Sequence, residues 1–203
     1  MLFRCPSRPL RRRSHPVGLA ALICVMAAST AAFADPRAEI RGDMDDNLRS
    51  MLQRAVGEVD GPPANRFEAR RRARSAMESA EALLRSEGYY QATLEDLVEG
   101  EDTAVAVVSV VPGRRFVLDE PIVQYIAPEP ETDVAAQAEQ DIGLVQGAPG
   151  RATDVIAAEG RLVAGLSRRG YADAATQPRR VVVDHADFTV KPTYMIVSGQ
   201  LVR

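Results

Sequence analysis

The first half of the chain shows a strand period, then a helix period, then a strand period again. Residues 38–41 alternate as in a short strand, and helical spacing follows a turn and helix cap at residues 42–43. A second helix is predicted from the cap residue Asn65 to Gly88, before strands at residues 89–98 and 103–111. The later strand is apolar at nearly every position, which is typical of a central strand. The apolar stripe of the second helix comprises Phe67, Ala73, Ala76, Met77, Ala80, Leu83 and Leu84.

From Phe116 the same order begins again. Residues 116–126 are predicted to form a strand that Pro121 interrupts, as at an edge or a bulge. Helical spacing resumes near residues 134–141 and in a further helix that ends at Gly170, and a closing hairpin is expected at residues 181–197. The last helix is expected to bury one face that carries Val155, Ile156, Leu162, Val163 and Leu166.

The two halves match each other. Gly88-Tyr89 aligns with Gly170-Tyr171 at an offset of 82 residues, and Gly113 aligns with Gly199 at an offset of 86. The sequence therefore predicts an α+β protein of two tandem β-α-α-β-β modules, each with its helices on one face of a small mixed sheet. The predicted modules span residues 35–113 and 114–199, and residues 200–203 are expected to begin a third. The boundary glycines are Gly88, Gly113, Gly170 and Gly199.

The N-terminal segment has the composition of a signal peptide. Five arginines and no acid precede an apolar run from Val17 to Met26, and small residues follow up to Ala34. The run is too short to span a membrane as a helix. We expect export to the periplasm with cleavage after about Ala34. A twin-arginine signal at Arg12-Arg13 and a lipoprotein box at Cys24 are weaker alternatives.

Charge and cysteine content exclude several classes of function. Without residues 1–34 the chain has 28 acidic and 20 basic residues, which disfavours nucleic acid as a partner. Both cysteines, Cys5 and Cys24, lie in the predicted signal, so the remainder has no disulfide and no thiolate metal ligand.

The chain offers little catalytic chemistry. His185, between Asp184 and Asp187, has the residue types of a metal or acid-base cluster, but a polar hairpin turn explains the pattern better. No nucleophile elbow and no phosphate-binding glycine loop occurs. We expect no enzyme activity, no catalytic residue, no bound metal and no cofactor.

The densest positive charge after the signal lies in the second helix, at Arg70, Arg71 and Arg74. Such a run is usually a solvated helix face. A docking face for an acidic partner or for anionic lipid headgroups, with peripheral membrane contact, is the functional alternative.

The order of these motifs resembles the POTRA domains of the BamA superfamily, and specifically the N-terminal region of the translocation and assembly module subunit TamA. The resemblance covers the chain from residue 35 onward. It rests on Ile40-Arg41-Gly42, Asn47-Leu48, Arg66, Arg70, the run Leu83 to Tyr90, and Val110-Val111-Pro112-Gly113. Members of that family continue into a third module and an outer-membrane barrel that tethers them. We therefore expect this chain to be a truncated or split member or a fragment.

The resemblance implies a periplasmic module of a machinery that assembles and translocates outer-membrane proteins, including autotransporters. The implied partners are unfolded or partly folded outer-membrane proteins and an inner-membrane subunit similar to TamB. A free sheet edge would bind an extended partner by backbone pairing. Alternatives are a structural spacer that docks to the inner-membrane partner and the POTRA region of a secretion-partner transporter. The candidate edge residues are Tyr89, Tyr90, Ala92, Leu94, Leu97, Val181 and Val183.

Overall fold

The structure of the protein is a computed structural model that describes residues 35–202. The predicted signal peptide and its cleavage point lie outside the described residues. No described helix combines the length and the apolar character that crossing a membrane requires.

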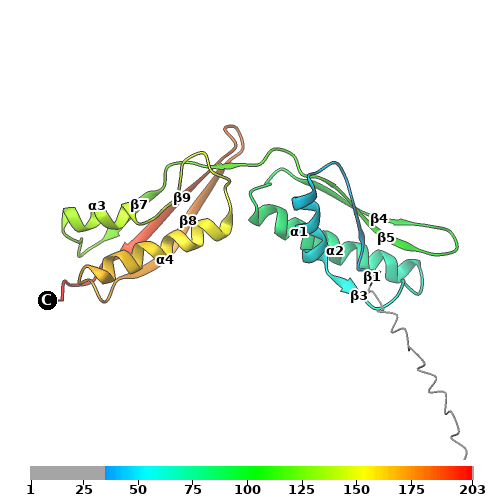
Figure 1. Cartoon of the computed structure of the whole chain (residues 1–203), viewed down its shortest axis with the longest axis horizontal. Coiled ribbons are helices and arrows are strands. Elements are labelled where there is room, and N and C mark those ends of the chain that lie inside the picture. Colours follow the sequence, from blue (N-terminus) through cyan, green and yellow to red (C-terminus); the bar gives the residue numbers. More distant parts are fainter. Residues whose placement is uncertain (1–34, 203) are drawn as a thin grey trace, which may run out of the picture. The chain divides into compact units, whose positions relative to one another are not determined.

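Two sheets, each with its own pair of helices, follow each other along the chain (Figure 1). The N-terminal module consists of β1 (Asp35–Pro36), β2 (Glu39–Arg41), α1 (Asp46–Val56), β3 (Glu58–Val59), α2 (Arg66–Ser86), β4 (Thr93–Glu99) and β5 (Val105–Val111). The C-terminal module consists of β6 (Val117–Leu118), β7 (Ile122–Ile126), α3 (Thr132–Gln140), α4 (Ala152–Arg168), β8 (Ala175–Asp184) and β9 (Thr189–Val197).

Both sheets place their last strand in the middle. In the N-terminal module β5 pairs in parallel with β2 and antiparallel with β4. In the C-terminal module β9 pairs in parallel with β6 and β7 and antiparallel with β8. The predicted α+β fold class and the central position of the apolar strand are therefore confirmed. The small β1–β3 pairing was not predicted.

Each module has a separate hydrophobic core. The core of the N-terminal module joins α1 and α2 to one face of the sheet, and four alanines of α2 that are completely buried let the helix approach closely. The core of the C-terminal module gathers Leu118, Leu162, Leu166, Tyr194 and Ile196 with smaller residues of α3 and α4. Since the two cores share no residue, each module buries its own apolar surface.

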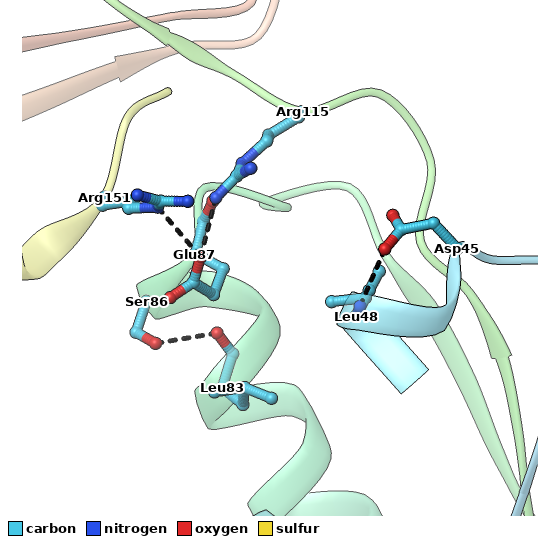
Figure 2. Close-up of polar contacts among 7 residues, drawn as sticks. All are labelled: Asp45, Leu48, Leu83, Ser86, Glu87, Arg115 and Arg151. Carbon is cyan, nitrogen blue, oxygen red and sulfur yellow. Dashed lines mark hydrogen bonds and ion pairs between the residues drawn. The ribbon is translucent and has the colours of Figure 1, made fainter. Parts of the chain in front are cut away.

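Local chemistry explains where the first two helices begin. The Asp45 carboxylate accepts a hydrogen bond from the Leu48 amide at 2.8 Å (Figure 2), so Asp45 caps α1 and the predicted cap at residues 42–43 is wrong. Asn65 caps α2 by accepting from the Glu68 amide at 2.9 Å, as predicted. The Glu68 carboxylate accepts from the Ala64 amide and from Arg72, and these bonds lower its pKa.

The same helix ending occurs twice. Gly88 and Gly170 have φ values of 92° and 97°, which a residue without Cβ adopts at little cost. The Tyr89 amide donates to the Leu84 carbonyl at 2.8 Å, and the Tyr171 amide donates to the Leu166 carbonyl at 3.1 Å. The hydrogen bonds of the two helix ends therefore repeat in register.

The strand that begins the C-terminal module is broken as the sequence predicted. Residue 118 of β6 pairs with residue 190 of β9, and residue 122 of β7 pairs with residue 193. The segment that joins β6 to β7 therefore has one residue more than the part of β9 opposite it. Pro121 lies in this break and Pro192 lies opposite it, and neither has an amide hydrogen to donate.

Two sequence predictions about side chains and one about the start of a strand are wrong. Phe67 was assigned to the buried stripe of α2 but is 82% exposed, because two residues from Ala69 correspond to about 200° of helix rotation. Ile156 is 51% exposed, because it lies one position from the buried Val155. The strand predicted to begin at Tyr89 begins at Thr93, because Tyr89 to Ala92 complete the turn after α2.

Candidate protein-binding edges

Two strands that follow long helices lie at free edges of their sheets. β4 is an edge of the order β2-β5-β4, and β8 pairs with β9 alone. Among the candidate edge residues, Leu94 and Leu97 lie in β4, and Val181 and Val183 lie in β8. Tyr89, Tyr90 and Ala92 precede β4, so they are not edge-strand residues.

β8 is exposed on both of its faces. Of its ten residues only Val183 is partly buried, and Val181 and Val182 are 40% and 42% exposed. Val181 and Val183 lie opposite Pro192 and Val190 of β9, on the face of the sheet that α4 covers further along. Because β8 has a free edge and two exposed faces, an added strand would meet no steric obstacle there.

An apolar groove runs between β8 and α4. Its volume is about 310 Å³, and Ile156 of α4 faces it with half of its surface exposed. The groove is lined by Tyr90, Ala152, Val155, Ile156, Arg179, Val181, Val183 and Val190. Desolvation in this neighbourhood raises the pKa of the Tyr90 hydroxyl. The arrangement offers backbone pairing at the strand and an apolar hollow for alternate side chains of a bound segment.

One charged residue lines the groove. It is Arg179, which forms an ion pair with Glu159 of α4, so the two charges neutralise each other. The neighbouring Arg180 is exposed and points to the opposite face of the sheet, since it pairs with Thr193 of β9. The backbone register shifts between Gln177 and Arg180, where Pro178 lies.

β4 is better covered and more acidic than β8. Leu94 packs on the core beneath α2, and Asp96 and Val98 on the same face are half-buried. The opposite face carries Glu95 and Glu99, and Glu99 accepts two hydrogen bonds from Arg41 at 2.7 and 2.8 Å.

The arginine run forms one patch on α2. Arg70, Arg71 and Arg74 are exposed together with Phe67, and these four side chains line a shallow hollow of about 220 Å³. Arg72, in the same run, instead turns to Glu68 at 2.6 Å and to the Gly61 carbonyl.

A polar cluster surrounds the end of α2. Glu87 accepts hydrogen bonds from Arg115 at 2.7 Å and from Arg151 at 3.2 Å (Figure 2), with 15% of its side chain exposed. Phe116 is completely buried, and its ring packs edge-on against Tyr90 and His185. His185 also lies 3.3 Å from the Gln91 amide nitrogen. Gly113 lies between β5 and this cluster, and Gly199 follows β9 by two residues.

The groove uses residues that sequence reasoning missed or placed elsewhere. Ile156 had been assigned to the core, and Ala152 and Arg179 had no assigned role. The one signal in the sequence was the apolar pair Val155-Ile156, because two adjacent residues of a helix cannot both face the core centre.

The chain was compared with known proteins at the levels of sequence and structure. No protein-family model and no curated protein matches the sequence. BamA POTRA3-5 of Haemophilus influenzae is similar in structure at 18% identity, over 83% of this chain and 68% of that chain, with a TM-score of 0.47. POTRA1-3 of the periplasmic domain of Omp85 from Anabaena gives 14% identity over 80% and 60%, with a TM-score of 0.48.

POTRA1-2 of the same Anabaena periplasmic domain is similar at 15% identity, over 81% of this chain and 96% of that chain, with a TM-score of 0.45. These three solved structures are POTRA segments of BamA and Omp85 proteins.

Proposed function

We propose that this chain is a periplasmic protein-binding part of a machinery that assembles and translocates outer-membrane proteins, and that it binds extended client segments at β8. The sequence resemblance to POTRA domains and the repeated β-α-α-β-β topology support the proposal. The observation that carries it is β8 itself, a long edge strand exposed on both faces beside an apolar groove.

The geometry suits a strand of an outer-membrane protein. Such strands span about 9–11 residues and alternate apolar and polar side chains. β8 has ten residues, so one client strand could pair along most of its length. Apolar side chains of the client would then enter the groove beside Ile156 and Val181, while its polar side chains would point to solvent. Backbone pairing explains how one edge could accept clients of many sequences.

Substitution of matched residues on the two edges tests the proposal. Val181 and Leu97 have nearly the same exposure, 40% and 39%, and both belong to edge strands. Val181→Asp and Ile156→Asp place a charge in the groove, and we expect each to weaken client binding about tenfold or more because the charge must be desolvated. Leu97→Asp is the matched control and should change binding less than twofold.

The probe is a fluorescein-labelled peptide of alternating valine and threonine, compared by anisotropy with a peptide of the same composition in scrambled order. Circular dichroism verifies that each variant is folded. Equal loss of binding in Leu97→Asp and Val181→Asp would remove the preference for β8. Unchanged binding in Val181→Asp and Ile156→Asp would refute the groove.

A spacer that docks to a TamB-like inner-membrane partner is the second candidate function. The contacts of Glu87 with Arg115 and Arg151 favour it, because they fasten the end of α2 to residues of the C-terminal module. A spacer would lose activity in Glu87→Lys and keep it in Val181→Asp, whereas an edge-binding module would show the reverse. Autotransporter assembly in cells that carry each variant distinguishes the two.

A further inference from the structure

The outer face of α2 combines one aromatic ring with three arginines. Phe67, Arg70, Arg71 and Arg74 have the spacing i, i+3, i+4 and i+7, so they share one face of the helix. This face lies away from the alanines that bury the other side of α2 against the core. Phe67 is the most exposed large apolar residue in the described part of the chain, at 82%.

The three arginines have no acidic partner among residues 35–202, in contrast to their neighbours. Arg72 pairs with Glu68 at 2.6 Å and Arg85 pairs with Glu81 at 2.6 Å. The Glu68 carboxylate is further held by the Ala64 amide; the charge of Arg71 contributes to lowering the pKa of Glu68, but no ion pair joins the two side chains among residues 35–202. Three positive charges without an ion-pair partner among the described residues therefore lie within two turns of α2. The net charge of the chain after residue 34 is negative.

The hollow among these side chains fits a phosphate group. It has a volume of about 220 Å³ and is lined by Phe67 and the three arginines alone. Guanidinium groups bind phosphate oxygens through paired, charge-assisted hydrogen bonds. An exposed aromatic ring at the level of basic side chains is typical of surfaces that rest in the interface of a membrane.

We propose that this face of α2 binds the anionic headgroups of a phospholipid surface, with Phe67 entering the interfacial layer. A lipid surface is favoured over an acidic protein because Phe67 protrudes as a single ring. An aromatic residue that anchors a protein complex usually belongs to a larger apolar patch, and here the other side chains that line the hollow are all arginines. The contact is peripheral and reversible, since three arginines and one ring provide a limited attraction.

The experiment measures sedimentation with vesicles of mixed phosphatidylglycerol and phosphatidylcholine, and with phosphatidylcholine alone. It uses the chain from Asp35 to Arg203, because residues 1–34 carry five arginines and an apolar run that would themselves bind vesicles. Both hydrophobic cores are built from residues beyond Ala34, so this chain retains everything that holds the modules together.

We expect binding to the anionic vesicles only, with an affinity that falls as salt is raised. The triple variant Arg70→Gln, Arg71→Gln, Arg74→Gln should bind at least tenfold more weakly, and Phe67→Ala several-fold more weakly. The control variant Arg54→Gln, Arg114→Gln, Arg180→Gln removes the same charge from other exposed positions and should lose less than threefold.

Equal binding to neutral and anionic vesicles, or equal loss in the two triple variants, would overturn the proposal. The proposal would also be overturned if this face of α2 bound an acidic protein in solution and the Arg70→Gln, Arg71→Gln, Arg74→Gln variant bound vesicles as well as the unsubstituted chain does. Val181→Asp should leave vesicle binding unchanged, which separates this surface from the β8 edge.

Discussion

β4 and β8 hold equivalent places in their modules, yet they present different surfaces. Each follows the long helix of its module and pairs with the central strand on one side only. α2 packs along β4, so one face of that strand is closed by the core. α4 contacts β8 much less, and the space left over is the apolar groove.

The chemistry of the two edges differs as well. Five acids and no base occur between Thr93 and Asp102, in β4 and its turn, while β8 carries two arginines and three consecutive valines. An acidic strand repels other acidic chains and is a known protection of free edges. The comparison shows that the same topology gives a protected edge in one module and an open one in the other, according to where the helix lies.

The largest expected effect comes from substitutions in the hydrophobic cores, because each core supports the edge strand of its own module. Leu84 and Leu166 are equivalent and completely buried in different cores. Leu84→Ala and Leu166→Ala should each lower the free energy of unfolding of their own module by about 2–5 kcal/mol, because each leaves a cavity. Thermal unfolding followed by NMR would show which module loses its signals first.

Peptide binding completes that test. If β8 is the binding edge, Leu166→Ala should weaken peptide binding near the unfolding temperature of its module, and Leu84→Ala should not. A loss of binding in Leu84→Ala at a temperature where the C-terminal module remains folded would break the comparison in favour of β4.

A smaller effect is expected at the glycines that end the two long helices. An alanine at Gly88 would be strained at φ 92°, and its Cβ would meet the Gly150 and Phe116 carbonyl oxygens at 3.1 and 3.3 Å. An alanine at Gly170 would meet the Leu201 side chain at 2.8 Å and the Val202 carbonyl oxygen at 3.1 Å.

We expect about 1–3 kcal/mol of destabilisation for Gly88→Ala and slightly less for Gly170→Ala, where one of the two contacts is a mobile side chain. Denaturant unfolding measures both. Because Gly170 precedes β8, Gly170→Ala should also alter peptide binding. Equal stability of Gly88→Ala and the unsubstituted chain would show that the turn after α2 accommodates a Cβ at residue 88 without strain.

The smallest effect concerns pH and is specific to the C-terminal module. The Asp119 carboxylate lies 2.9 Å from the Lys191 ammonium, and this contact lowers the pKa of Asp119. Arg169 likewise lowers the pKa of Asp141. A carboxyl group whose pKa is lowered by folding stabilises the fold above its ordinary pKa of about 4, and that stability is lost as the pH falls further.

We therefore expect the unfolding temperature of the C-terminal module to fall as the pH drops below about 4, with a shallower slope in Asp119→Asn. Calorimetry at a series of pH values measures the slope. The matched control Asp184→Asn removes a carboxylate of the β8–β9 turn that forms no ion pair in the described structure. An unchanged slope in Asp119→Asn would exclude the contact with Lys191 as its cause.

Sequence periodicity predicted the order of elements but could not predict how much of an edge strand is exposed to solvent. The nearly continuous apolar run of residues 103–111 and the helix-ending glycines are local signals, and the structure agrees with both. Phe67 and Ile156 were misplaced because apolar residues were assigned to the core by type, and their exposure depends on one or two residues of helix rotation. The module boundaries at residues 113 and 199 remain predictions.

The groove beside β8 depends on the distance between α4 and the edge of the sheet, and no local pattern encodes that distance. Val181 illustrates the limit. It lies on the face of the sheet that the helices cover and yet keeps 40% of its surface exposed, since α4 does not reach it.

The central claim, that β8 rather than β4 pairs with an extended chain, is tested most directly by amide hydrogen exchange followed residue by residue. The account predicts that the alternating valine and threonine peptide slows exchange at alternate amides of residues 175–184, which are the amides that face away from β9. Exchange within β4 should stay the same. Slower exchange along residues 93–99 with no change in β8 would contradict the account.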